Sequence, residues 1–191
     1  LQQLRSQIDP HFLFNTLNVI LQTAGQETAY RTQALITALS HLLRYSLMSN
    51  DEQVPLSREV RIVDEYYSIY HVRFGERVQM EWRISDSIDL TETLVPSFIL
   101  QPIVENAFKH GVSYNRPSFI HLRIDYADGK VVSTIGNSLH SPQAEKHNAG
   151  IGLENVRKRL SLIYGPKNYS LDIEETKETY TVKLVIPTLN A

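Results

Sequence analysis

Apolar residues recur every three or four positions along the first fifty residues, which is the spacing of one face of a helix. This pattern predicts a helix over residues 1–20 and a second over residues 29–49, joined by residues 25–28. The second helix has an apolar face too broad for a lone surface helix, made of Leu35, Ile36, Leu39, Leu42, Leu43 and Leu47. Because two helices cannot cover both apolar stripes, we expect the hairpin to pair with a second copy in a four-helix bundle.

Beyond a polar linker at residues 50–53, the apolar period changes several times between the helical and the two-residue spacing. A third helix is predicted from residue 57, closed by Gly75, and its apolar stripe is Val60, Val63, Tyr67, Tyr70 and Phe74. The other predicted elements are strands at 78–84, 120–126, 130–135, 169–173 and 180–186, and helices at 97–110 and 151–164. Pro96 opens the first of these two helices and Gly111 closes it.

The remaining signals concern turns and loops. Asp128 and Gly129 form a dipeptide typical of a tight hairpin turn. Residues 139–149 are polar and aperiodic, which predicts a mobile loop. Together the elements predict an α+β protein, with a helical hairpin at residues 1–52 and a second domain at residues 53–191. In that second domain we expect a mixed or antiparallel sheet with its helices on one face.

Composition narrows the class of protein. The 191 residues are 42% hydrophobic and 21% charged, as in ordinary globular proteins. The net charge of −2 argues against a nucleic-acid-binding surface, and the lack of cysteine excludes disulfides and cysteine metal sites. No apolar run reaches the roughly 18 residues that span a bilayer. The chain opens on Leu1 within a helical pattern, so we expect it to be a piece of a longer protein.

His11 follows a proline in the middle of the first helical pattern. Pro10 lacks an N–H, and a proline inside a helix destabilises that helix by about 3 kcal/mol. Such a break would have a function if it oriented the histidine. Alternatively, Asp9 caps a new helix with Pro10 at its first position, and the local signals leave both arrangements open. A neutral imidazole is able to attack phosphorus, and Asn15 follows one turn later on the same face.

Two further groups of residues suit phosphate chemistry. Asn106 offers an amide oxygen of the kind that Mg²⁺ accepts, and Lys109 and His110 lie within a turn of it. Gly150 and Gly152 stand where a loop meets a predicted helix. Glycines let a backbone approach phosphate closely, and a helix start presents N–H groups to an anion.

Residues 9–15 resemble the phosphoacceptor box of sensor histidine kinases of two-component systems, in the LytS/YesM-type subfamily whose acceptor lies in a P-H-F-x-x-N sequence. Further blocks follow in that family's order, at residues 42–46, 54–56, 67–74, 101–107 and 150–153. The resemblance covers nearly the whole chain. It implies that residues 53–191 form an ATPase α/β sandwich of the Bergerat type.

The resemblance also implies roles for single residues. His11 would accept the phosphoryl group, Asn15 would serve dephosphorylation, and Asn106 would coordinate Mg²⁺. Glu105 matches an acidic position whose role, metal ligand or base, stays open. The family's G-I-G-L-x-N-x-x-x-R sequence is matched by Gly150, Gly152, Leu153, Asn155 and Arg159.

The sequence departs from the family's pattern in two places. Phe12 stands where many members carry an acidic base, for which Asp9 is a possible substitute. Asn137 stands where members carry an Asp that accepts a bond from the adenine amino group, and the glycines after it are missing. Asn137 keeps a carbonyl acceptor but lacks the charge, so the strength of nucleotide binding is open.

The sequence therefore favours an ATP- and Mg²⁺-dependent protein histidine kinase. It would phosphorylate itself on His11 and pass the group to an aspartate of a response regulator, with residues 139–149 closing over the nucleotide. We expect a homodimer, in the cytoplasmic part of a sensor anchored through an upstream membrane segment. The alternative is a non-catalytic dimeric signalling scaffold with a degenerate nucleotide site. Phe12 and the missing glycines favour it, and His11, Asn106 and the pair Gly150 and Gly152 oppose it.

Overall fold

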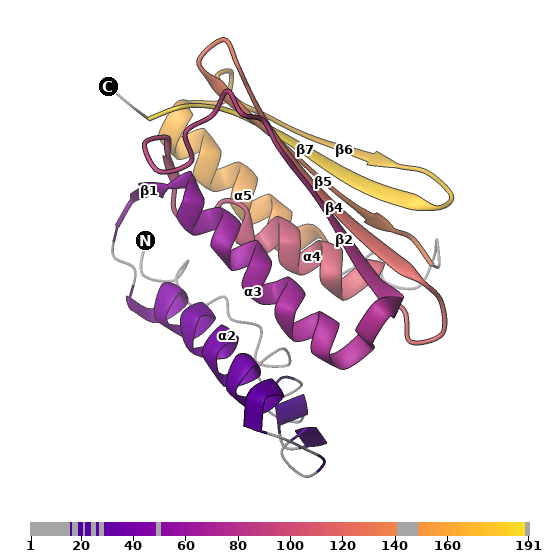
Figure 1. Ribbon diagram of the computed structural model, residues 1–191. Coiled ribbons are helices and arrows are strands. Elements are labelled where there is room, and N and C mark those ends of the chain that lie inside the picture. Colours follow the sequence, from indigo (N-terminus) through magenta and orange to yellow (C-terminus); the bar gives the residue numbers. More distant parts are fainter. Residues whose placement is uncertain are drawn as a thin grey trace.

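The computed structural model describes residues 16, 19–20, 22–23, 26, 29–48, 51–140 and 149–189 (Figure 1). His11 and Asn15 lie outside these residues, as do most of the predicted first helix and residues 141–148 of the predicted loop. The predicted second and third helices are confirmed as α2 (Ala29–Met48) and α3 (Leu56–Phe74).

Two short strands were missed by the sequence analysis. β1 (Gln53–Pro55) pairs antiparallel with β3 (Leu94–Pro96), with Val54 opposite Val95. The prediction of a linker through residue 53 was therefore wrong at Gln53. A strand of three residues is too short to display an alternating period, which explains the miss.

The main sheet is mixed, as predicted. Its order is β2-β4-β5-β7-β6, with β2 and β4 parallel and all other neighbours antiparallel. The strands are β2 (Val78–Ile84), β4 (Ser118–Ala127), β5 (Lys130–Ser138), β6 (Ser170–Glu175) and β7 (Thr179–Pro187), and a 3₁₀ turn, η2 (Gly75–Arg77), precedes β2. Asp128 and Gly129 have φ of 51° and 71°, the left-handed values of a type I′ turn, so the predicted hairpin is confirmed.

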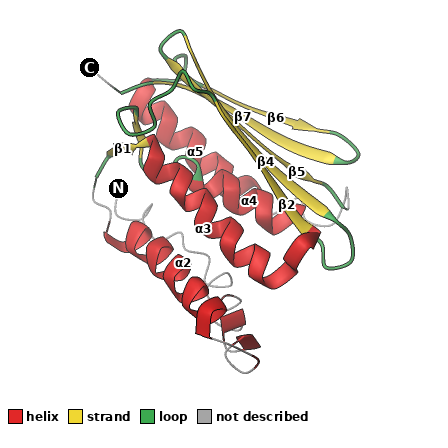
Figure 2. Ribbon diagram, viewed as in Figure 1, coloured by secondary structure: helices red, strands yellow, loops and turns green. Residues whose placement is uncertain are grey.

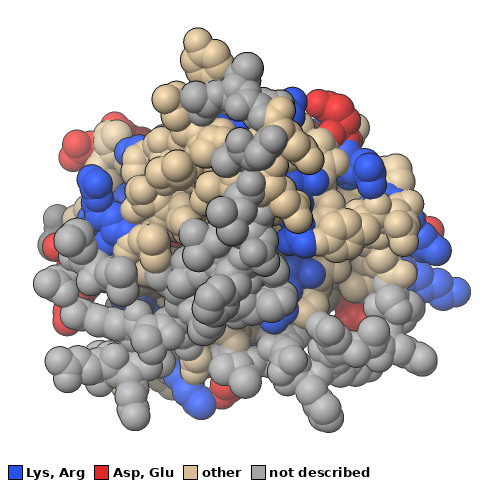
Figure 3. Space-filling view, turned by 90° about the horizontal axis from the view of Figure 1, so that it is seen from below, with Lys and Arg blue, Asp and Glu red and all other residues tan. Residues whose placement is uncertain are grey.

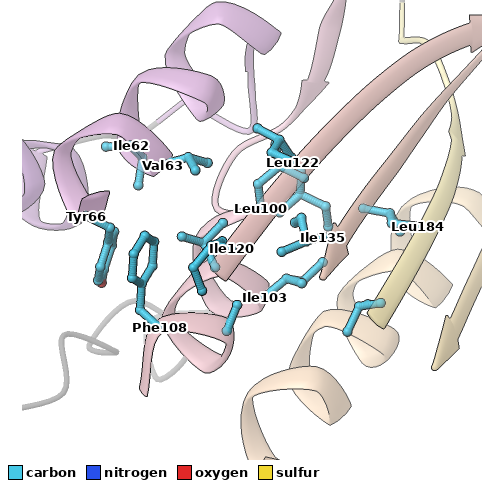
Figure 4. Close-up of a cluster of buried hydrophobic side chains, with 14 of the residues drawn as sticks. Ile62, Val63, Tyr66, Leu100, Ile103, Phe108, Ile120, Leu122, Ile135 and Leu184 are labelled. Atoms are coloured by element: carbon cyan, nitrogen blue, oxygen red, sulfur yellow. The ribbon is translucent and has the colours of Figure 1, made fainter. Parts of the chain in front are cut away.

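The helices α3, α4 (Gln101–Gly111) and α5 (Ala149–Tyr164) cover one face of this sheet, as predicted (Figures 1 and 2). Their side chains meet those of β4, β5 and β7 in a single buried cluster (Figure 4). α2 packs on α3, on the side away from the sheet, and adds Leu35, Leu42 and Tyr45 to the cluster. α3 thus covers part of the apolar face of α2.

The buried stripe of α3 differs from the predicted one. Val63 and Phe74 are buried as expected, but Val60, Tyr67 and Tyr70 are only partly buried. The deepest positions form a neighbouring stripe, Leu56, Glu59, Ile62, Val63, Tyr66 and Ile69. α3 lies between α2 on one side and α4 and β2 on the other, so it has two packed faces. A single amphipathic stripe cannot describe a helix packed in this way.

α4 begins at Gln101, four residues later than predicted. Pro96 ends β3, and Pro102 occupies the first turn of the helix, where a missing N–H is harmless. Both prolines are plausible helix starts, and the pattern alone led to the wrong one. Residues 97–100 instead form a tight connection between β3 and α4, which we call the junction turn.

Candidate functional site

α4 presents the first group of predicted site residues beside the sheet. Asn106 is half-buried and lies one turn beyond Pro102, so the two occupy the same side of the helix. Lys109 is exposed and His110 is half-buried, both in the last turn of α4. Within this group, Asn106 carries the amide oxygen that suits Mg²⁺.

The end of α4 lies against Asn137 in β5. The Asn137 side chain is only 1% exposed, and its Nδ2 donates a hydrogen bond to the carbonyl oxygen of Ser138 at 2.8 Å. A Cβ added at Gly111 would stand 2.5 Å from the Asn137 Cβ, so only glycine permits this approach. The Ser138 hydroxyl also donates to the Gly111 carbonyl oxygen at 3.3 Å. The structure therefore brings Asn137 to the helix that carries Asn106.

The first turn of α5 lies against the first turn of α4. α5 begins at Ala149, two residues before the predicted start, so Gly150 and Gly152 are both inside the helix. A Cβ at Gly152 would come 3.9 Å from the Pro102 Cβ, an ordinary contact distance. Because Asn106 and Pro102 share one side of α4, the structure brings the glycine turn toward Asn106.

The other predicted residues of α5 are more dispersed. Leu153 is 4% exposed and belongs to the core, and Asn155 is half-buried one turn beyond Gly152. Arg159 lies farther along, where its Nη2 donates a hydrogen bond to the Ser97 Oγ at 2.9 Å. Its guanidinium also lies over the Phe98 ring, 5.9 Å from the centroid. Both of these contacts join Arg159 to the junction turn.

Glu105 contacts α3 through Tyr66. It shares a hydrogen bond with the Tyr66 hydroxyl, which also interacts with the side chain of Gln101. Burial raises the pKa of Tyr66 well above its ordinary value, and the nearby charge of Glu105 adds to this rise. Across the described ranges, no cluster of three or more His, Cys, Asp or Glu side chains is arranged to hold a metal ion.

Comparison with known proteins finds histidine kinases along the whole chain, in agreement with the resemblance seen in the sequence. The sequence model of the histidine kinase family matches residues 1–78. Sensor histidine kinase YesM of Bacillus subtilis is 33% identical over 200 aligned positions, which cover 100% of this chain and 33% of YesM. Sensor histidine kinase YpdA of Escherichia coli is 32% identical over 178 positions, covering 86% of this chain and 30% of YpdA. The chain thus spans about a third of the length of these relatives.

This chain belongs to the sensor histidine kinases of the YesM/LytS type. Solved structures agree on the fold. The catalytic domain of histidine kinase ThkA has a TM-score of 0.53 at 15% identity, covering 71% of this chain and 93% of that one. The histidine kinase domain of the blue-light activated kinase of Erythrobacter litoralis has a TM-score of 0.54 at 14% identity, covering 97% and 92%. The predicted sandwich is confirmed.

Two further observations complete the description of this chain. On the face shown in Figure 3, basic side chains lie at several places around the edge, with acidic ones between them. None of the helices in the part of the chain that the structure describes is both long and apolar enough to cross a bilayer.

The sequence analysis gave no role to two residues that organise the start of α4, Glu59 and Tyr45. Glu59 is fully buried in α3, and its carboxylate accepts hydrogen bonds from the junction turn and from the Tyr45 hydroxyl of α2. A signal was present, because Glu59 lies between Leu56 and Val63 at helical spacing. An acidic residue on an apolar stripe of that kind indicates a paired buried carboxylate.

Proposed function

We propose that this chain is the kinase core of a sensor histidine kinase. It binds Mg·ATP beside α4, the first turn of α5 and the end of β5, and it transfers the γ-phosphoryl group to His11. The phosphoryl group then passes to an aspartate of a response regulator. The relatives are named sensor histidine kinases, and this chain corresponds to a third of their length.

One observation carries the proposal: two glycine contacts bring the candidate groups to a single helix. The contact between Gly111 and Asn137 joins β5 to α4, and the contact between Gly152 and Pro102 joins α5 to α4. Asn106 lies on α4 between these two contacts. These contacts support the proposal that Asn137, Asn106 and the glycine turn surround one nucleotide.

The residues have distinct chemical tasks in this proposal. The neutral imidazole of His11 attacks the γ-phosphorus, so that the N–P bond forms while the bond from phosphorus to the β–γ bridging oxygen breaks and ADP leaves. Asn106 holds Mg²⁺, which supplies charge neutralisation at the phosphates when bound. N–H groups at the start of α5, near Gly150 and Gly152, face the phosphates, and the Asn137 carbonyl accepts from the adenine amino group. Such transfers depend mainly on positioning and electrostatics.

The proposal extends to assembly and location. We propose that residues 1–52 form the dimerisation and phosphoacceptor hairpin, and that residues 53–191 bind the nucleotide. Ile36 and Tyr30 on α2 are 49% and 80% exposed, and these apolar groups suit pairing with a second copy. We further propose that the core lies in the cytoplasm, with an anchor in the membrane supplied by a segment outside this chain.

The test is incubation of the chain with radiolabelled ATP and Mg²⁺. We expect label that is labile in acid and stable in alkali, as phosphohistidine is, and we expect it to vanish in His11→Gln. His71→Gln is the matched control, because His71 lies on α3, away from the candidate site, and its side chain is 38% exposed. Label that persists in His11→Gln would contradict the assignment of the acceptor.

A second candidate function is a signalling scaffold without catalysis. Asn137, in place of the family's Asp, favours it. Thermal unfolding with and without Mg·ATP separates the two functions, since a kinase is stabilised by its nucleotide. We expect a shift that Asn106→Asp reduces. No shift in the unsubstituted chain, together with no label, would favour the scaffold.

A further inference from the structure

The junction turn is held by a buried carboxylate from another helix. The two Glu59 oxygens accept hydrogen bonds from three consecutive backbone N–H groups, those of Phe98 at 2.8 Å, Ile99 at 3.0 Å and Leu100 at 2.8 Å. Glu59 is 0% exposed. Burial raises its pKa above the ordinary value, and the hydrogen bonds it accepts oppose that rise. The start of α4 is therefore fixed by a side chain of α3.

Phe98 is the strained member of this turn. Its φ is 58°, a left-handed value that costs a residue other than glycine about 1 kcal/mol or more. Strain of this kind persists only where the surroundings over-determine the backbone, and it is a pointer to function. Glu59 supplies one constraint on Phe98, and Arg159 of α5 supplies another by lying over its ring.

Tyr45 of α2 supplies the third constraint. Its hydroxyl donates to the Glu59 carboxylate and accepts the Phe98 N–H at 2.9 Å. Its ring lies 4.4 Å from the Phe98 ring, centroid to centroid. A single side chain of the hairpin's second helix thus contacts both the carboxylate and the strained residue.

The network leaves the start of α4 little freedom to move independently of α2. Ser97 adds two bonds to the chain between α2 and β1, from its N–H to the Glu52 carbonyl at 3.1 Å and from its hydroxyl to the Asp51 carbonyl at 2.8 Å. Closely packed, fully hydrogen-bonded networks shift between discrete arrangements rather than deforming gradually. These contacts form a continuous connection from α2 to the helix that carries Asn106.

We propose that Glu59 is a positioning residue for α4, and that Tyr45 acts through it to couple α2 to the nucleotide site. This proposal rests on the proposed function. If α4 binds the nucleotide and the hairpin carries the acceptor, the coupling lets the nucleotide influence that hairpin. Coupling is reciprocal, so the position of α2 also influences the nucleotide.

Tyr45→Phe is the decisive variant, because it keeps the ring against Phe98 and removes only the hydroxyl. Its matched control is Tyr67→Phe, which removes a hydroxyl that contacts His71 within α3, away from the junction turn. Each variant is compared with the unsubstituted chain in three measurements. These are the affinity for Mg²⁺ with a non-hydrolysable ATP analogue, the autophosphorylation rate at saturating ATP, and amide hydrogen exchange in α2 and α4.

We expect Tyr45→Phe to slow autophosphorylation about tenfold, the effect of about 1.4 kcal/mol on the activation barrier, with a smaller loss of nucleotide affinity. We also expect the nucleotide to slow amide exchange in α2 in the unsubstituted chain and in Tyr67→Phe, and to do so much less in Tyr45→Phe. Glu59→Gln should weaken both nucleotide binding and the rate. If Tyr45→Phe behaves like Tyr67→Phe in all three measurements, the coupling is wrong.

Failure of the proposed function gives a different result. In that case the unsubstituted chain neither binds the analogue nor becomes labelled, before any variant is compared. The role of Tyr45 and Glu59 is then decided by exchange without nucleotide. Faster exchange through residues 101–107 in Tyr45→Phe, but not in Tyr67→Phe, supports positioning of α4 by this pair, and unchanged exchange overturns it.

Discussion

Gly111 and Asn137 are in such close contact that the last residue of α4 has no room for a side chain. A Cβ at Gly111 would lie 2.5 Å from the Asn137 Cβ and 2.7 Å from its Nδ2. The contact holds the end of α4 on β5 at Asn137, the residue that the resemblance matches to the family's Asp. The position of α4 and the orientation of Asn137 are therefore parts of one packing arrangement.

Gly111→Ala should therefore destabilise the protein. Added groups in a well-packed site cost about 1–3 kcal/mol, and here the obstructing atoms include the Cβ of a buried residue, which cannot rotate away. Urea unfolding at equilibrium measures the loss. Unfolding midpoints that coincide for Gly111→Ala and the unsubstituted chain would contradict the contact.

Gly152→Ala should separate nucleotide binding from stability. A Cβ at Gly152 meets only ordinary contact, 3.9 Å from Pro102, and alanine is the better helix former. We expect the unfolding free energy to stay the same or to rise slightly. We expect affinity for a non-hydrolysable ATP analogue to fall, because in the proposed function the α5 backbone approaches phosphate at Gly152 and the methyl group would obstruct it. Affinity equal to that of the unsubstituted chain would remove Gly152 from the site.

The long elements were predictable because their apolar periods extend over several turns or alternations. α2, α3, β2 and the β4–β5 hairpin are all found within a few residues of the predicted bounds. The start of α4 was not, because Pro96 and Pro102 give the same local signal and only tertiary contacts distinguish them. The true start is set by Glu59, which is more than forty residues away from Gln101 along the chain.

The candidate site was predictable in its residue types and less so in its geometry. Asn106, Asn137 and Gly152 come from separate elements, and the sequence alone gives no sign that Gly111 and Pro102 are the contact points between them. Tyr45 was included only as part of a family block, since a tyrosine on an apolar stripe is indistinguishable from any core aromatic. Its role depends on its hydroxyl, which the hydrophobic pattern ignores.

Glu59→Ala should be among the most destabilising single substitutions in the described part of the protein. It removes the acceptor of the buried N–H groups of Ile99 and Leu100 and of the Tyr45 hydroxyl, and each buried group left unpaired costs about 1–3 kcal/mol. We expect a loss of about 3 kcal/mol or more in urea unfolding. Glu65→Ala is the matched control, because Glu65 lies on the same helix but pairs with His41 and Arg61 at a partly exposed site. Equal losses for the two variants would contradict the special role of Glu59.

His121 should make stability depend on pH. Its ring lies on β4 against Gly136 of β5, where an added Cβ would overlap the imidazole. Burial lowers the pKa of His121 below its ordinary value of 6.5, Arg83 lowers it further, and Glu81 partly opposes them. Between the lowered pKa and 6.5 the folded protein binds fewer protons than the unfolded chain, so stability rises with pH through that window. The contribution is complete above 6.5 and is lost as the pH falls toward the folded-state pKa.

Urea unfolding of the unsubstituted chain and of His121→Gln, from about pH 8 down to about pH 5, measures this contribution. We expect the stability of the unsubstituted chain relative to His121→Gln to decrease as the pH falls below 6.5, since glutamine does not titrate. NMR titration of the ring C–H of His121 gives the pKa directly. A folded-state pKa of 6.5 or above would contradict the prediction, because protonation would then be no harder in the folded protein than in the unfolded chain.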